Sequence, residues 1–133
     1  MTHAIELRIP TQRPFHGVAR LVVGGLAARH DLSYEALEDL QLALVTVLEG
    51  ENYPAKDEVA VELRVSDDSI EMVIGPLNGD RVRRDLDSSG EELGLGRLLA
   101  TLVEDAEVEA REDGDWLRLV KRVRGIKPAG ANA

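Results

Sequence analysis

The stretch from residue 33 to residue 53 constrains the fold more than any other part of the chain. Ser33 is suited to cap the start of a helix, because its hydroxyl can accept a hydrogen bond from a backbone N–H of the first turn. Between residues 40 and 48 only two residues are polar, so the helix is apolar on more than one face and must lie between other elements. Gly50 and Pro54 are suited to end it. We therefore predict a buried core helix around which the domain is organised.

Five segments alternate apolar and polar residues, which is typical of half-buried β-strands. The third of them is expected to end at Gly75 and Pro76, which are strong strand breakers. A short polar connection follows the second segment, and a turn around Gly114 precedes the last, so we expect two antiparallel hairpins. The predicted strands are residues 3–9, 59–65, 70–74, 107–111 and 116–123.

Two more segments place apolar residues at helical spacing. Residues 15–30 form a predicted amphipathic helix, and residues 91–105 form another, with Gly94 and Gly96 near its start. Residues 80–90, by contrast, are charged and irregular. We expect the most mobile loop of the chain there, with room for one helical turn between Val82 and Leu86.

The order of these elements indicates the fold class. Separate helices combined with mainly antiparallel strands predict an α/β two-layer sandwich, in which a five-stranded sheet is covered on one face by three helices. A chain of 133 residues fits a single domain, which we place at residues 1–124. Residues 125–133 contain few apolar side chains and are expected to form a disordered tail.

Composition argues against several classes of function. The formal net charge is −9 and only 3% of residues are aromatic, which disfavours binding to nucleic acids and to anionic membranes. The chain has no cysteine for a disulfide or a metal site. His3, His16 and His30 lack the spacing of metal ligands and are predicted to lie on the surface. The N-terminus has no signal-peptide pattern and no long apolar run occurs, so we expect a cytoplasmic location.

Three stretches carry a family resemblance in addition to the element order. They are LEDLQLALVTVLEG in the core helix, VIGPLNG after the first hairpin, and GLGRLLATLVEDAEV before the second. Over residues 3–123 the chain resembles the anti-sigma factor serine kinases, which are small bacterial members of the GHKL (histidine kinase-like) ATPase superfamily. The resemblance implies the Bergerat fold, a site for Mg-ATP and a role in the regulation of transcription.

The helix motif of that family departs from its pattern in this chain. Family members use a helix Glu as general base and an Asn four residues later as magnesium ligand, and these positions fall on Thr46 and Gly50. Thr has no basic group at neutral pH and Gly has no side-chain oxygen, so neither can take the role. A register shifted along the chain would recruit Glu49 or Asn52 instead.

The two nucleotide loops are also altered. The family's Asp-x-Gly-x-Gly turn selects adenine through its Asp, and Gly75 stands at that position here, while Asn78 and Gly79 end the motif. The phosphate loop is kept in outline by Gly94 and Gly96, and by Gly90 before them. These glycines are equally consistent with turn geometry and close packing. Together they define a vestigial pocket formed by Gly75, Asn78, Gly79, Gly94 and Gly96.

These losses favour a family member that keeps the fold without the kinase, with no cofactor and no metal. Its function would be to bind a protein, and the resemblance implies a sigma factor or a STAS-domain anti-sigma antagonist, with a homodimer as a further possibility. Arg20 and Leu21 match the partner-binding position on the first helix, although an ordinary solvated charge explains Arg20 equally well.

Two alternatives stay open. The first is an active serine/threonine protein kinase with a rearranged Mg-ATP site built from Glu49, Asn52, Gly94 and Gly96. The second is a structural or dimerisation module with neither role. Titration with ATP and magnesium separates the first of these from the binding protein.

Overall fold

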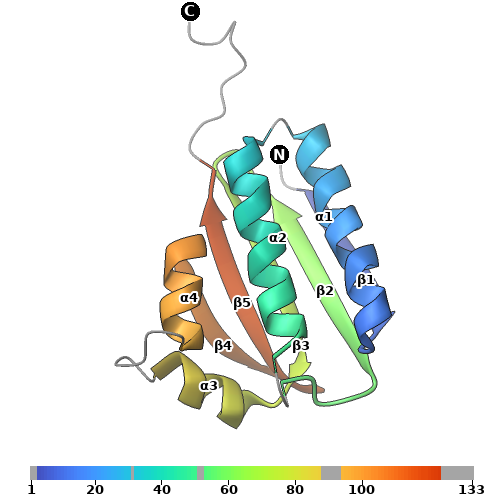
Figure 1. Ribbon diagram of the computed structural model, residues 1–133, viewed down its shortest axis with the longest axis vertical. Helices are drawn as coiled ribbons and strands as arrows, with labels where there is room; N and C mark the ends of the chain where they lie inside the picture. The colour runs from blue at the N-terminus through green and yellow to red at the C-terminus, as the bar shows by residue number, and fades with distance from the viewer. Residues whose placement is uncertain (1–2, 31, 51–52, 88–93, 124–133) are drawn as a thin grey trace, which may run out of the picture.

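The computed structural model describes residues 3–30, 32–50, 53–87 and 94–123, and the predicted tail at 125–133 lies outside these residues. Within them the chain forms five strands, four α-helices and one 3-10 turn (Figure 1). The elements in chain order are β1 (His3–Pro10), the 3-10 turn (Arg13–Phe15), α1 (His16–Arg29), α2 (Tyr34–Leu48), β2 (Glu58–Val65), β3 (Ser69–Leu77), α3 (Gly79–Asp87), α4 (Leu95–Leu102), β4 (Asp105–Arg111) and β5 (Gly114–Arg122).

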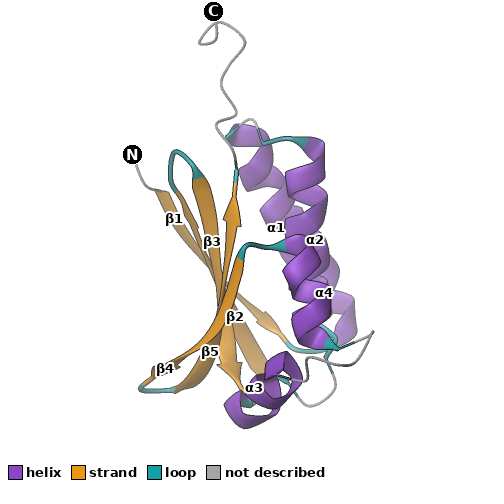
Figure 2. Cartoon of the chain, turned by 90° about the vertical axis from the view of Figure 1, so that its left-hand side faces the viewer, coloured by secondary structure: helices purple, strands orange, loops and turns teal. Residues whose placement is uncertain are grey.

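The strands form one antiparallel sheet in the order β1-β2-β3-β5-β4. Figure 2 shows α1, α2 and α4 packed on one face of this sheet, while no helix of the described residues covers the other face. The predicted two-layer sandwich with a five-stranded antiparallel sheet is therefore confirmed. The three helices predicted to cover one face are α1, α2 and α4, and α3 is a further helix where only a single helical turn was expected.

The core helix α2 lies where its composition predicts. The Ser33 hydroxyl accepts a hydrogen bond from the Ala36 N–H at 3.0 Å, which caps the helix. The helix packs into a continuous core with the inward side chains of the three central strands. The fully buried members of this core include Leu40, Leu44, Leu63, Ile70, Met72, Ile74, Leu99, Leu117 and Leu119.

The segment expected to be an irregular loop forms helix α3. Val82 and Leu86 lie one turn apart, and Val82 is buried. Arg81 is paired with Asp85 at 3.4 Å across the same helix. The charged residues of this segment therefore form the outer side of an amphipathic helix. Composition alone does not distinguish such a helix from a charged loop.

Strand β3 is longer than predicted and continues through Gly75 and Pro76 to Leu77. A register shift between Ile74 and Leu77 interrupts the pairing with β5 at the proline, which has no N–H to donate. Beyond this irregularity Leu77 forms an isolated bridge with Pro54. The expectation that Gly75 and Pro76 end the strand was therefore wrong.

Helix α4 ends at Leu102 rather than residue 105, and β4 begins at Asp105 rather than residue 107. The backbone changes to an extended conformation at Val103, which starts the chain on its path into β4. Within the described residues no helix is long and apolar enough to cross a membrane.

His16 corrects the prediction that the histidines lie on the surface, because it is buried at the start of α1 with 6% of its surface exposed. The buried ring keeps a polar partner, because its Nε2 lies 3.1 Å from the Thr11 carbonyl oxygen and can donate a hydrogen bond to it. His3 and His30 are far apart in the sequence, yet their ring centroids are 5.3 Å apart.

Candidate functional site

The end of α2 is where the family resemblance places the catalytic helix motif. Thr46 donates its hydroxyl to the Leu42 carbonyl oxygen at 2.7 Å, so this side chain is satisfied within its own helix. Two residues after the helix, Gly50 lies directly beneath the aromatic ring of Tyr53. Any side chain added to Gly50 on this backbone would collide with that ring. The space beside position 50 is thus filled by an aromatic side chain from the same chain.

Tyr53 is tied to helix α3. It is buried with 7% of its surface exposed, and its hydroxyl donates to Asp85 at 2.6 Å. Burial and this hydrogen bond to a carboxylate raise the pKa of Tyr53 well above its ordinary value of about 10. Arg81 lies 3.4 Å from the same carboxylate and balances its charge. We call this arrangement of Gly50, Tyr53 and Asp85 the Tyr53 plug.

The backbone around Tyr53 is held by the end of β3. The Asn78 N–H donates to the Tyr53 carbonyl oxygen at 2.6 Å, and the Ala55 N–H donates to the Pro76 carbonyl oxygen at 3.2 Å. Asn78 in turn accepts a backbone hydrogen bond from Val82, in the first turn of α3. These bonds join the end of α2, the end of β3 and α3 into one unit.

Gly75, at the position of the adenine-selecting Asp, faces away from the helices. Its neighbour Ile74 points into the core, whereas a side chain at Gly75 would collide with the ring of Trp116 on β5. Trp116 has 3% of its surface exposed, its Nε1–H donates to Asp113 at 2.8 Å, and the Arg111 guanidinium lies 4.2 Å from its ring centroid. The space beside Gly75 is therefore also filled by an aromatic ring.

The remaining vestigial-pocket residues are distributed over two separate grooves. Asn78 and Gly79 line a groove of about 580 Å³ at the end of the sheet. Gly94 caps the start of α4 without a side-chain hydrogen bond, and Gly96 lines a different groove, of about 470 Å³. A side chain at Gly96 would meet the Leu86 carbonyl oxygen, so this glycine permits the close approach of α3 and α4.

The structure describes one of the two residues of the shifted register. Glu49 directs a carboxylate oxygen to within 3.7 Å of the His16 Nδ1, which has no hydrogen-bond partner among the described residues. The Glu49 carboxylate thus faces the start of α1. Asn52 lies outside the described residues.

The outer side of α1 and α2 forms a second region, and it contains the predicted partner-binding residues. Leu21 is 77% exposed and Tyr34 is 74% exposed. Arg20 lines a groove of about 430 Å³ between the two helices, together with Tyr34, Glu38 and Leu42. The Arg20 carbonyl oxygen accepts a hydrogen bond from the Gln41 side chain at 3.0 Å, which joins the helices there.

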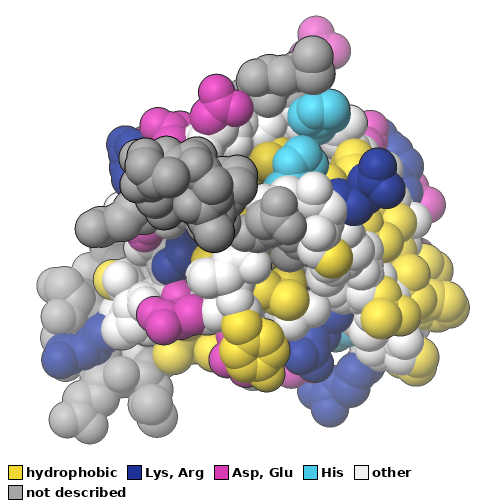
Figure 3. Space-filling view, turned by 90° about the horizontal axis from the view of Figure 1, so that it is seen from above, with side chains coloured by type: hydrophobic (Ala, Val, Ile, Leu, Met, Phe, Trp, Pro, Cys, Tyr) yellow, Lys and Arg dark blue, Asp and Glu magenta, His cyan; other side chains and the backbone are white. Residues whose placement is uncertain are grey.

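We call this region the α1–α2 surface and define it by its exposed apolar side chains. Figure 3 shows hydrophobic side chains gathered on the side of the molecule where α1 lies, with basic side chains at their margin. Exposed apolar groups on neighbouring helices are a common feature of protein-binding surfaces. The members are Phe15, Val18, Leu21, Tyr34 and Leu42.

The nucleotide chemistry implied by the resemblance does not fit the residues present. Positions 46, 50 and 75 supply no carboxylate base, no magnesium ligand and no adenine acceptor. Sequence analysis missed Tyr53 and Trp116 as the side chains that fill these places. For Tyr53 the sequence offered a signal, because this rare aromatic residue follows Gly50 by three positions, whereas Trp116 is far from Gly75 in the sequence.

Comparison with known proteins finds relatives of one type, which are named serine-protein kinase RsbW. No family model matches. The serine-protein kinase RsbW of Bacillus pumilus is 31% identical over 129 residues, covering 80% of this chain and 78% of that protein. The serine-protein kinase RsbW of Halalkalibacterium halodurans is 28% identical, covering 82% and 76%.

A solved structure shares the fold. The crystal structure of the RsbU and RsbW domains of Rv1364c from Mycobacterium tuberculosis superposes with a TM-score of 0.64 at 13% identity. The match covers 95% of this chain and 34% of that one. Similarity at this identity concerns the fold alone.

Proposed function

This chain belongs to the family of the RsbW serine-protein kinases, and we propose that it is an anti-sigma-type regulator that holds a protein partner without phosphorylating it. In this proposal the chain has kept the family fold and lost Mg-ATP binding. Its partner would be a sigma factor or a STAS-domain antagonist, and it would act in the cytoplasm.

The single observation that carries the proposal is the Tyr53 plug. The ring of Tyr53 occupies the space that a magnesium ligand at position 50 would need, and its hydroxyl is hydrogen-bonded to Asp85. Trp116 occupies the corresponding space at Gly75. In this proposal a working nucleotide site beside α2 would require the Tyr53 ring to move, and that ring is buried and hydrogen-bonded.

The α1–α2 surface supports the binding half of the proposal. It exposes apolar side chains beside Arg20, and the groove there also contains Glu38 and Asp39. Apolar contacts would supply affinity, and the mixed charges at the margin would select the partner. The net charge of −9 is suited to a partner with basic faces.

A second candidate function is the active serine kinase, which the printed name of the relatives favours. In that case Glu49 would have to serve as general base, with the nearby His16 holding its carboxylate. The Tyr53 plug would then have to open when nucleotide binds.

Calorimetric titration with ATP and magnesium at high micromolar concentration decides between the two. We expect neither heat nor a thermal shift, whereas RsbW of Bacillus pumilus serves as the matched control for a relative that is named a kinase. Saturable heat with this chain would overturn the proposed loss of nucleotide binding and bring the kinase forward.

A further inference from the structure

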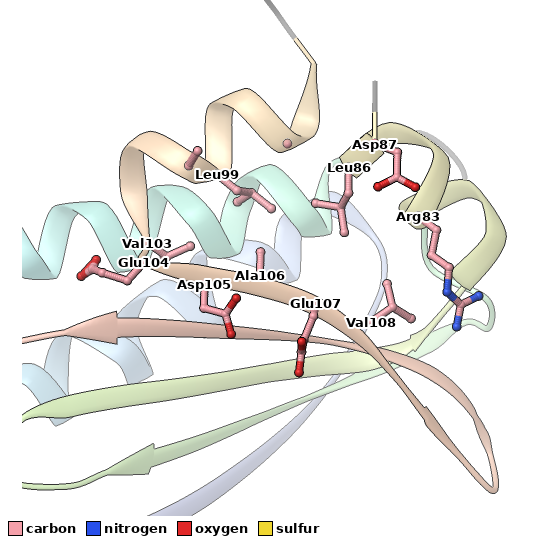
Figure 4. A pocket seen from close by; sticks show the side chains of 12 residues that line it. Arg83, Leu86, Asp87, Leu99, Val103, Glu104, Asp105, Ala106, Glu107 and Val108 are labelled. Atoms are coloured by element: carbon pink, nitrogen blue, oxygen red, sulfur yellow. The ribbon is translucent and has the colours of Figure 1, made fainter. Parts of the chain in front are cut away.

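A groove lies between α4, the end of α3 and the edge strand β4, on the opposite side of the molecule from α1 (Figures 1 and 4). We propose that this groove and the free edge of β4 bind an extended segment of a partner protein, in which apolar residues alternate with lysine or arginine. This site is separate from the α1–α2 surface and from the Tyr53 plug. We call it the β4 groove.

The backbone of β4 is available for pairing on one side. In the sheet order, β4 has β5 as its neighbour and stands at an edge. The two-residue turn after Arg111 pairs Arg111 with Gly114, and in such hairpins these flanking residues exchange hydrogen bonds. Counting back by twos, the backbone groups of Ala106, Val108 and Ala110 point toward the open edge. An added strand can pair with these three residues.

The side of β4 that faces the helices is apolar. Figure 4 shows Ala106 and Val108 pointing from β4 toward α4, with Leu99 and Leu86 approaching from the helices. The groove has a volume of about 470 Å³, and Val103 also lines it. Side chains on one face of an added strand would lie against these groups and bury apolar surface.

The other side of β4 is acidic. Asp105 and Glu107 alternate with the apolar residues, and Figure 4 shows their carboxylates directed away from α4. Arg118 on β5 contacts Glu107 and lies within 4 Å of three further carboxylates, so one cation serves four acidic residues. The other three are Asp105 at 3.7 Å, Glu109 at 3.9 Å and Glu71 at 3.3 Å. Basic side chains on the second face of an added strand would complete this pairing. The lining as a whole contains four acidic residues and one Arg.

Charge also argues against a second copy of this chain as the occupant. Antiparallel pairing of two β4 strands about Val108 would place Glu107 of one copy opposite Glu109 of the other, and pairing about Glu107 would oppose two identical carboxylates. Charged edge strands resist such self-association. A partner strand of alternating basic and apolar residues would place no carboxylate opposite those of β4.

The test is a titration of the isotopically labelled full chain with the blocked peptide KVKVKVK, followed by backbone amide chemical shifts. We expect saturable shifts centred on Ala106, Val108 and Ala110. The peptide EVEVEVE, which has the same pattern with opposite charge, should produce none. Equal binding of both peptides, shifts centred on α1 and α2, or no saturable change at millimolar peptide would each overturn the proposal. Dimerisation of the chain through β4 would overturn it also.

Two variants test separately the contribution of backbone pairing and the contribution of the acidic side chains. Ala110→Pro removes an outward N–H at an edge, a place where strands accept proline, and should abolish the shifts at β4.

The double variant Asp105→Asn, Glu107→Gln should weaken binding about five-fold, because each exposed ion pair contributes modestly. The matched control is Glu6→Gln, Glu58→Gln at the opposite side of the sheet, which should leave the affinity unchanged. Circular dichroism verifies that each variant is folded, and an unaltered affinity in the Asp105 and Glu107 variant would contradict the proposed charge recognition.

Discussion

The end of α2 and the α1–α2 surface differ in how far their large side chains are exposed. At the end of α2, Tyr53 is 7% exposed and fills the space above a glycine. On α1, Leu21 is 77% exposed and contacts water. In a kinase of this family we would expect the first region to be open to nucleotide, so the contrast is what the proposed loss of nucleotide binding and retention of partner binding would require.

The energetic consequences of the two regions differ accordingly. A buried aromatic ring of this kind contributes about 1.5–3 kcal/mol to folding through removal of apolar surface from water. An exposed leucine contributes little to folding, and a single one is ordinary. Several together on neighbouring helices make a surface whose apolar area is buried when a partner binds. Substitutions in the first region should therefore change stability, and those in the second should change binding.

The largest expected effect is that of Tyr53→Ala. Loss of the ring leaves a cavity above Gly50 and removes the hydrogen bond from Tyr53 to Asp85, so the free energy of unfolding should fall by about 3–5 kcal/mol. Denaturant unfolding measures this. Leu44→Ala is the matched control in the middle of α2 and should cost about 2–5 kcal/mol. A loss under about 1 kcal/mol for Tyr53→Ala would mean that the ring does not fill this space.

Gly75→Asp introduces the Asp that the family resemblance implies at this position and should be destabilising by about 1–3 kcal/mol, because the new side chain must displace Trp116. Trp116 is the one tryptophan of the chain, so its fluorescence reports the displacement directly as a shift to longer wavelength. Gly17→Asp makes the same chemical change where a Cβ meets nothing within 4 Å, and it should leave the emission unchanged. Unchanged emission in Gly75→Asp would refute the contact.

The Tyr53 plug should make stability depend on alkaline pH. The folded protein raises the pKa of Tyr53, so above about pH 10 the unfolded chain releases a proton that the folded chain retains. The free energy of unfolding should therefore be level below that pH and fall as pH rises further. Tyr53→Phe should lose this decline and cost about 0.5–1.5 kcal/mol at neutral pH. Tyr34→Phe, at a 74% exposed position, should keep the decline.

The smallest effect on stability is expected for Arg20→Glu. An exposed charge contributes little to folding, so the melting temperature should stay within about 2–4 °C of the parent value. Binding to the sigma factor or STAS-domain protein should weaken, as measured by calorimetry with the purified partner. Arg29→Glu, an exposed position on the same helix, should leave binding intact. Equal affinity of the Arg20 variant and the parent would remove Arg20 from the interface.

Elements with a strong periodic pattern could be predicted from the sequence. The alternation of β2 and the serine-capped apolar run of α2 were sufficient, because each depends on residues close together in the chain. The errors at α3 and at the end of β3 have one cause. Glycine and proline predict the end of a strand, and a high charge predicts a loop. Here Pro76 is accommodated by an irregularity in the sheet, and the charges of α3 lie on its outer side.

The filling of the candidate site depends on contacts between distant residues. Gly75 and Trp116 are brought together by the pairing of β3 with β5, and His16 meets Glu49 because α1 packs beside α2. Residue types alone indicated that positions 46, 50 and 75 lack the family's functional groups. They did not indicate which side chains occupy the space that results.

Local patterns in the chain were thus enough to determine the strands, the core helix, the family resemblance and the missing functional groups at Thr46, Gly50 and Gly75, since these follow from residue identity and short-range periodicity. The tertiary structure alone decided that Tyr53 and Trp116 fill two of these places, that His16 is buried and that β4 stands at a free edge. The physical reason is that burial and contact are set by packing between elements, to which residues far apart in sequence contribute.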